Sequence, residues 1–116
     1  MPKPTSAAPD QSLSPRLLQD TASLFALLSA TVRLHILWLL AGGDQDVGTL
    51  ADKTGQSVAT VSHHLGKLKL AGLVRARHQG KRHVYTATDP QVLEVIRLAL
   101  GDQLQRSQPR GRARHA

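Results

Sequence analysis

The sequence predicts a mainly α-helical domain that carries one small β-hairpin. Three observations lead to this fold class. Apolar residues recur at helical spacing in five segments between residues 14 and 105. Capping residues and glycines stand at the ends of those segments. The pattern becomes strand-like only around residues 73–87, where two short segments flank a glycine turn.

The first two helices should supply much of the core. Ser14 followed by Pro15 is an N-cap with proline at the first helical position, so the first helix begins there. A second helix is expected over about residues 30–41, ending at Gly42-Gly43. We expect its His35 to be a hydrogen-bonded residue near the core. Its core-filling residues should be Leu34, Ile36, Leu37, Trp38 and Leu40.

Two helices joined by a sharp turn follow. A short helix over residues 47–54 ends at Gly55. Ser57 then caps a fourth helix over about residues 58–71, which Gly72 terminates. This spacing is typical of a helix-turn-helix.

The hairpin and the last helix complete the domain. Residues 73–78 and 82–87 flank the turn Gln79-Gly80-Lys81 and read as two antiparallel strands. Asp89 and Pro90 repeat the cap-plus-proline signal, and the helix that they start should run to about residue 105.

The composition is that of one soluble domain with two polar tails. The chain has 116 residues, enough for one domain, which we place at residues 14–105. Residues 1–13 and the basic residues 106–116 are expected to be disordered tails. There is no cysteine, so disulfides, thiolate metal sites and cysteine nucleophiles are excluded.

No membrane association is expected. The most apolar run, residues 24–41, is interrupted by Arg33 and His35. The N-terminus lacks a charged-then-apolar signal pattern, so we expect a cytoplasmic protein.

The positive charge is concentrated in one part of the chain. The formal net charge is +7, and residues 53–88 contain seven Lys or Arg and no Asp or Glu. A clustered basic surface of this kind indicates a polyanionic partner such as nucleic acid.

The fourth helix has the pattern of a DNA-reading helix. Val58, Val61, Leu65 and Leu68 fall on one side of it, which should face the core. The opposite side carries small or polar residues that suit close approach to bases, while Lys67 would reach a phosphate. The predicted DNA contacts are Ser57, Ala59, Thr60, Ser62, His63 and Lys67, followed by Arg75, Arg77, Lys81 and Arg82 of the hairpin.

These residues resemble the ArsR/SmtB family of bacterial winged helix-turn-helix regulators, over about residues 24–104. The segment "VGTLADKTGQSVATVSHHLGKLKLAGLV" is similar to the family's helix-turn-helix signature, "LFALLSATVRLHILWLL" to its second-helix segment, and "RARHQGKRHVYT" to its wing. Gly66 departs from the family pattern, which has a long or charged residue there.

The resemblance implies a homodimer, joined through the first and last helices, that binds a palindromic operator in double-stranded DNA and usually represses transcription. In this family a bound metal or another signal typically changes the affinity for DNA. Our candidates for the apolar dimer contact are Leu17, Phe25, Leu28, Leu93, Ile96 and Leu100.

The histidines are better explained by DNA than by metal. Adjacent helical positions diverge by about 100°, so His63 and His64 should not share an ion. We expect His64 to pack at the edge of the core and His63 to contact DNA. Asp89 and Asp102 lie where the family places nitrogen–oxygen ligands, although glutamines occupy neighbouring ligand positions and Asp89 has a capping role.

A metal site in the hairpin is a further candidate. His78 and His83 could face each other across the two strands, or they could instead be polar side chains near phosphate. Because the chain has no cysteine, a metal site would use nitrogen and oxygen ligands, and such a site suits nickel or zinc.

Other functions stay open beside a sequence-specific regulator. A non-specific or architectural nucleic-acid-binding dimer would need the same basic surface. A dimer that only binds proteins is disfavoured by the polar face of the fourth helix. An enzyme is not expected, because no acid lies between residues 53 and 88 to orient a histidine beside Ser62.

Overall fold

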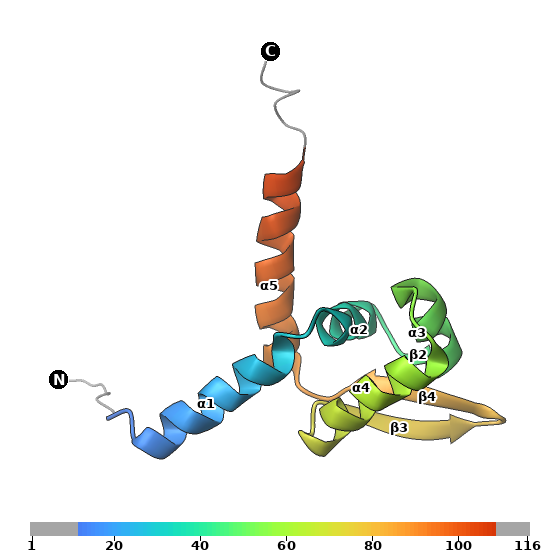
Figure 1. The fold of residues 1–116 in the computed structure, drawn as a ribbon, viewed down its shortest axis with the longest axis horizontal. Coiled ribbons are helices and arrows are strands. Elements are labelled where there is room, and N and C mark those ends of the chain that lie inside the picture. Colours follow the sequence, from blue (N-terminus) through green and yellow to red (C-terminus); the bar gives the residue numbers. More distant parts are fainter. Residues whose placement is uncertain (1–11, 109–116) are drawn as a thin grey trace, which may run out of the picture.

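The computed structural model describes residues 12–108, and within them the chain folds into five helices and a three-stranded antiparallel sheet (Figure 1). The sheet has the strand order β2-β4-β3. The predicted fold class is confirmed. In chain order the elements are α1 (Pro15–Leu28), α2 (Thr31–Ala41), β2 (Gln45–Asp46), α3 (Val47–Thr54), α4 (Val58–Leu70), β3 (Val74–Gln79), β4 (Arg82–Ala87) and α5 (Pro90–Ser107).

Side-chain caps start four of these helices. Ser14 Oγ accepts a hydrogen bond from the Leu17 amide at 3.0 Å, and Ser57 Oγ accepts one from the Thr60 amide at 3.0 Å. Asp89 accepts two backbone amides at the start of α5, as the sequence predicts. Each cap satisfies amides that have no partner inside the helix.

Strand β2 was not predicted. It has two residues, directly after the Gly42-Gly43 break, and pairs with β4 so that Gln45 lies opposite Tyr85 and Asp46 opposite Val84. Asp46 also caps α3 by accepting the Thr49 amide at 2.8 Å. A strand of two residues is too short to show an alternating pattern in the sequence. Its position is set by pairing with β4, so the sequence alone does not predict it.

The ends of three other elements differ slightly from the prediction. The β3–β4 turn has two residues, because Gln79 pairs with Arg82, and Gly80 takes a φ of 66° that glycine adopts without strain. Helix α4 ends at Leu70, with Ala71 as its C-cap. Helix α5 runs past residue 105 to Ser107, so the start of the predicted C-terminal tail is helical. The remainder of both predicted tails, residues 1–11 and 109–116, lies outside the described residues.

The core lies where α2 meets α3, α4 and the sheet. Its most buried large side chains are Ile36, Leu37, Leu50, Val61, Leu65, Leu68 and Ile96. Leu34 and Trp38 are only partly buried against it. Val58 is a correction to the predicted core face of α4, because its side chain is 50% exposed. It occupies the first turn, where the helix has not yet reached the core.

Helices α1 and α5 extend away from this core, as Figure 1 shows. The radius of gyration is 18.1 Å, whereas a compact chain of this length would have roughly 13 Å. Apolar side chains therefore remain exposed along both helices, including Leu18, Phe25, Val95 and Leu98.

No single helix among residues 12–108 is long and apolar enough to cross a membrane. Helices α1 and α2 together meet the length and composition required, but they are bent by 88° at the break between them.

Candidate nucleic-acid interface

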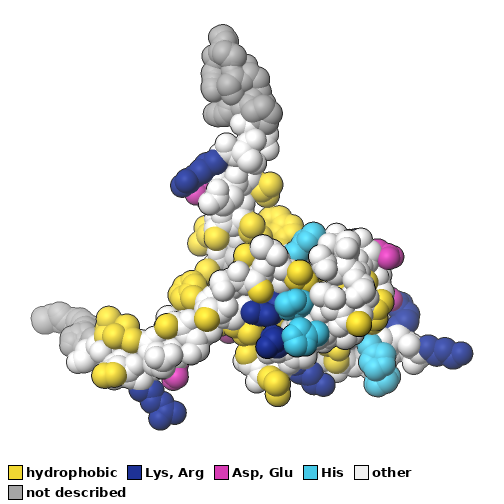
Figure 2. All heavy atoms as spheres, in the orientation of Figure 1, with side chains coloured by type: hydrophobic (Ala, Val, Ile, Leu, Met, Phe, Trp, Pro, Cys, Tyr) yellow, Lys and Arg dark blue, Asp and Glu magenta, His cyan; other side chains and the backbone are white. Residues whose placement is uncertain are grey.

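The outward side of α4 is exposed and carries small or polar residues. Ala59, Ser62, His63 and Lys67 are exposed, whereas Val61, Leu65 and Leu68 on the opposite side are fully buried. Helical spacing therefore separates the two sets as predicted. Figure 2 shows Lys, Arg and His side chains gathered over α4 and at its junction with α1.

Two of the predicted hydroxyl contacts are already engaged inside the protein. Ser57 Oγ lies 3.0 Å from Thr60 Oγ1, in addition to capping the helix. Ser57 and Thr60 therefore serve first to stabilise the start of α4. Ser62 and His63, one turn further on, have their side chains exposed and are better placed to contact bases.

His64 packs at the edge of the core, as expected, but its hydrogen-bond partner is distant in the sequence. Arg33 Nη1 of α2 lies 3.0 Å from His64 Nδ1, and Arg33 Nε donates to the Leu27 carbonyl oxygen of α1 at 2.6 Å. Burial lowers the pKa of His64, and the positive charges of Arg33, His63 and Lys67 lower it further. In the sequence, Arg33 is visible only as a charged residue that interrupts an apolar run, so its contact with His64 could not be predicted.

The hairpin β3–β4 forms the wing, and two of its four predicted DNA-binding cations are paired with carboxylates. Arg77 Nη1 lies 2.8 Å from Asp44 Oδ2, and Arg82 Nε lies 2.8 Å from Asp46 Oδ2. Both acids come from the segment just before α3. Arg75 and Lys81 form no ion pair within residues 12–108.

These contacts change the titration of the two acids. A hydrogen bond from Arg77, and then one from Thr86, lowers the pKa of Asp44. Hydrogen bonds from Thr49, and then from Arg82, lower the pKa of Asp46 to about 2. Residues 53–88 contain no acid, but the surface that they form is not free of acids. Asp44 and Asp46 lie beside the wing in the folded chain. Charge order along the chain could not reveal these pairs.

The predicted metal candidates do not come together in one site. Asp89 caps α5, and Asp102 is bound to Arg106 at 2.8 Å. His78 and His83 are cross-strand partners, with ring centroids 4.3 Å apart. Among the described residues, no three His, Asp or Glu side chains are grouped to hold an ion.

The predicted dimer residues are divided between core and surface. Leu28 and Ile96 are buried in the core, while Leu17 and Phe25 are about half exposed. Leu93 and Leu100 are partly buried. A groove of about 360 Å³ between α1, α2 and α5 has Leu28 and Ile96 in its lining, together with Phe25, Leu34, Val95, Ala99, Leu100 and Gln103.

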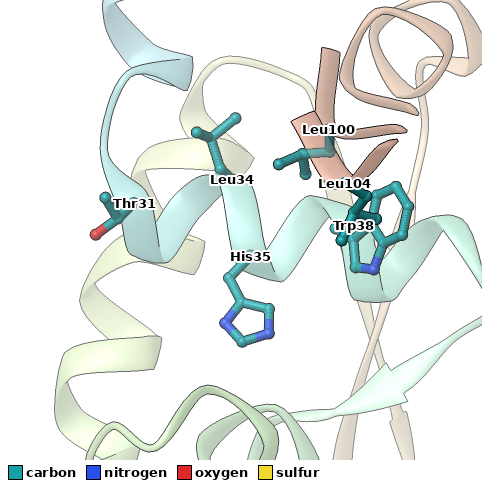
Figure 3. A pocket seen from close by; sticks show the side chains of 6 residues that line it. All are labelled: Thr31, Leu34, His35, Trp38, Leu100 and Leu104. Atoms are coloured by element: carbon teal, nitrogen blue, oxygen red, sulfur yellow. The ribbon is translucent and has the colours of Figure 1, made fainter. Parts of the chain in front are cut away.

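A second apolar pocket, of about 330 Å³, lies between α2 and α5. Trp38, Leu100 and Leu104 lie close together there, and the His35 ring points away from them (Figure 3). The expectation that His35 is a near-core residue is wrong, because its side chain is exposed. The apolar residues around it in the sequence are buried on the other side of α2.

The fold and this surface define a winged helix-turn-helix DNA-binding domain. It has a polar recognition helix held by a preceding short helix, and a basic hairpin beside it.

Comparison with known proteins agrees with this class. The model of the arsR family of bacterial regulatory proteins matches residues 31–76. The uncharacterized HTH-type transcriptional regulator MJ1325 of Methanocaldococcus jannaschii is 38% identical over 69% of this chain and 91% of that protein. The HTH-type transcriptional regulator KmtR of Mycobacterium tuberculosis is 34% identical over 63% of this chain, but the match spans only 56% of KmtR.

Two solved structures are similar over most of the chain. The antimony-specific transcriptional repressor AntR has a TM-score of 0.76 and 29% identity, covering 90% of this chain and 99% of AntR. The homodimeric winged helix-turn-helix DNA-binding domain of Mb0332 from Mycobacterium bovis has a TM-score of 0.68 and 30% identity, covering 88% and 97%. The chain belongs to the arsR family and is a DNA-binding transcriptional regulator rather than an enzyme.

Proposed function

We propose that this chain is a homodimeric transcriptional repressor that reads a palindromic operator with α4 and the wing. The observation that carries the proposal is the exposed face of α4, where Ala59, Ser62, His63 and Lys67 stand opposite a fully buried apolar side. A helix with small side chains on its outer face can enter the major groove, and its N-terminal half then lies against the base edges.

The wing would supply contacts to the phosphate backbone beside that groove. Arg75 and Lys81 are the wing cations without a carboxylate partner among residues 12–108, and they support a contact that depends on charge. Such contacts fix the orientation of the protein on the duplex, while α4 would provide the sequence specificity.

Base reading is tested by the double substitution Ser62→Ala with His63→Ala. We expect operator binding to weaken about 10- to 100-fold, because a lost base contact costs about 1–3 kcal/mol. Binding to random DNA should change much less. The measurement is a gel shift on the promoter adjoining this protein's own gene.

Gln91→Ala is the control, since Gln91 is an exposed polar residue at the start of α5. Operator affinity equal to that of the unsubstituted protein in the double variant would remove this face of α4 from the proposal. Loss in both variants would point instead to a general effect on the fold.

A non-specific or architectural protein would behave differently in competition. Random DNA at equal concentration should leave operator binding by a specific repressor intact, because specific sites are typically bound at least about 1,000-fold more tightly. Complete competition at equal concentration would favour the architectural alternative.

We also propose that any metal effector is nickel or zinc. AntR is named as antimony-specific, but this chain has no cysteine to provide thiolate ligands. The candidate donors are the imidazoles of His78 and His83 and the carboxylates of Asp89 and Asp102, which suit nickel or zinc better than thiophilic ions. Calorimetry with nickel or zinc on tag-free protein tests this, and heats no larger than dilution would refute it.

A further inference from the structure

Arg33 connects three helices at the junction between the body of the domain and α1. Its Nε donates to the Leu27 carbonyl oxygen of α1 at 2.6 Å, and its Nη1 lies 3.0 Å from His64 Nδ1 of α4. We propose that Arg33 is a positioning residue that ties the orientation of α4 to that of α1, and that protonation of His64 releases α4 and weakens DNA binding. The DNA-binding part of this inference rests on the proposed function.

The α1 end of this connection has a clear physical basis. Leu27 lies in the last turn of α1, where backbone carbonyls lack partners inside the helix. A cation is favoured at a helix C-terminus because the helix dipole is negative there. Arg33 thus caps α1 from the next helix.

The α4 end depends on the protonation state of His64. A guanidinium donates hydrogen bonds and accepts none. Nδ1 must therefore carry a lone pair, and the proton of neutral His64 must lie on Nε2. If His64 gains a second proton, Nδ1 becomes a donor facing another donor, and the contact with Arg33 becomes a repulsion.

The surroundings of His64 strengthen that repulsion. The charged or titratable groups that face it are Arg33 from α2 and His63 and Lys67 from its own helix. Arg33 and Lys67 also line a groove between α1 and α4, and its α1 side is formed by Ser23, Ala26 and Leu27, which carry no charge. The histidine cation would therefore have no opposite charge to offset it in that set.

The direction of the pH dependence follows. Burial, followed by the nearby positive charges, lowers the pKa of folded His64 below its usual 6.5. The connection is present at neutral pH. Its contribution to stability and to the placement of α4 is complete above the unfolded pKa and is lost as pH falls through the lowered folded pKa.

Two substitutions separate the contact from general packing. Arg33→Lys keeps the charge but cannot serve both acceptors in the fixed geometry of a guanidinium. We expect it to weaken operator binding about tenfold, because one of the two charge-assisted hydrogen bonds is lost. His64→Asn keeps an acceptor near the position of Nδ1 but does not titrate, so it should retain operator affinity at high pH.

The deciding measurement is the ratio of operator affinities of the unsubstituted protein and His64→Asn from about pH 8 to about pH 4.5, a range that extends well below the ordinary histidine pKa because the pKa of His64 is lowered. Protonation of His63, His78 and His83 affects both proteins, so the ratio isolates His64. We expect the unsubstituted protein to lose affinity relative to His64→Asn by about tenfold. A constant ratio would overturn the proposal.

The nitrogen chemical shifts of the His64 ring test the contact without DNA. Nδ1 should report an acceptor at neutral pH, and its shift should move in Arg33→Lys. If this signature is found but no operator is bound specifically, the proposed function fails while the connection stands. If Nδ1 is protonated at neutral pH, the connection itself is refuted.

Discussion

Gly66 lies in the middle of α4 and weakens the helix that should read DNA. Its backbone is helical, and a Cβ built there meets nothing within 4 Å. Gly66→Ala should therefore stabilise the protein by about 0.5–1 kcal/mol. Thermal unfolding should show a midpoint higher by a few degrees. The same Cβ points toward the proposed DNA surface, so operator affinity should fall or stay constant while stability rises.

Gly80→Ala is the matched control, because it adds the same methyl group at a site with equal space. There φ is 66°, a left-handed conformation that costs alanine about 1–2 kcal/mol. The midpoint should fall. A fall in Gly66→Ala would mean that the glycine fits a backbone conformation other than a regular helix.

Asp46 should give the protein an acid limit to its stability. Its pKa is about 2 in the folded state, against an ordinary 3.8, because Thr49 and Arg82 hydrogen-bond to the ionised form. The stabilisation is therefore present above about pH 4 and is lost as pH falls through the folded value. Asp46→Asn should keep the cap of α3 but reduce the difference in stability between pH 4 and pH 2, leaving the part that Asp44 contributes. Urea unfolding at several pH values measures it, and an unchanged pH profile in Asp46→Asn would contradict the assignment.

At the scale of elements, an acidic residue beside the wing holds one of the wing's arginines. Asp44 holds Arg77 at 2.8 Å, and Thr86 lies 3.2 Å from the same guanidinium nitrogen. Asp44→Asn should release Arg77 to bind phosphate. We expect affinity for all DNA sequences to rise, with about one additional ion in the salt dependence, because each phosphate contact releases about one counterion.

The comparison for this prediction is Asp20→Asn in α1. It removes the same charge from an exposed pair with Arg16, far along the chain from the wing. Adding Arg77→Ala to Asp44→Asn should cancel the gain. If both single acid variants raise affinity equally, net charge alone explains the effect, and the Asp44–Arg77 pair has no specific role.

The elements themselves were largely predictable, because local signals determine them. Ser14, Ser57 and Asp89 form the expected caps with neighbours two or three residues away. The errors concern contacts between distant segments. Strand β2 exists only beside β4, and Arg33 finds His64 at a separation of 31 residues. Periodicity could place His35 on an apolar helix but could not show which side of α2 the core would cover.

The candidate site was predictable to about the same extent as the helices and strands. Helical spacing separated the exposed face of α4 from its buried side, apart from Val58 in the first turn. It could not show that Arg77 and Arg82 would be paired with acids, since Asp44 and Asp46 lie more than thirty residues before them in the chain. The affinity of Arg77 and Arg82 for DNA phosphate therefore depends on ion pairs that exist only in the folded protein.

At the scale of the whole molecule, the exposed apolar surfaces of α1 and α5 require a partner, and we predict a second copy of the chain. Phe25 is 54% exposed at the rim of a groove whose lining includes Leu28, Val95 and Ile96. In a two-fold dimer every contact occurs twice. Burying the exposed half of Phe25 in both copies should contribute about 1.5–3 kcal/mol, since full burial of one large apolar side chain contributes about 1.5–3 kcal/mol.

Phe25→Glu should therefore give a monomer, because it places a carboxylate at each of the two symmetric contacts. Light scattering after gel filtration should report twice the 12.5 kDa chain mass for the unsubstituted protein and the single mass for the variant. Leu70→Glu, which changes a 92% exposed residue outside this groove, should stay dimeric. The Phe25→Glu monomer should also lose most of its operator affinity while keeping its helical content, because one α4 alone contacts only half of a palindrome. A variant that remains a dimer would place the contact between copies elsewhere than along α1.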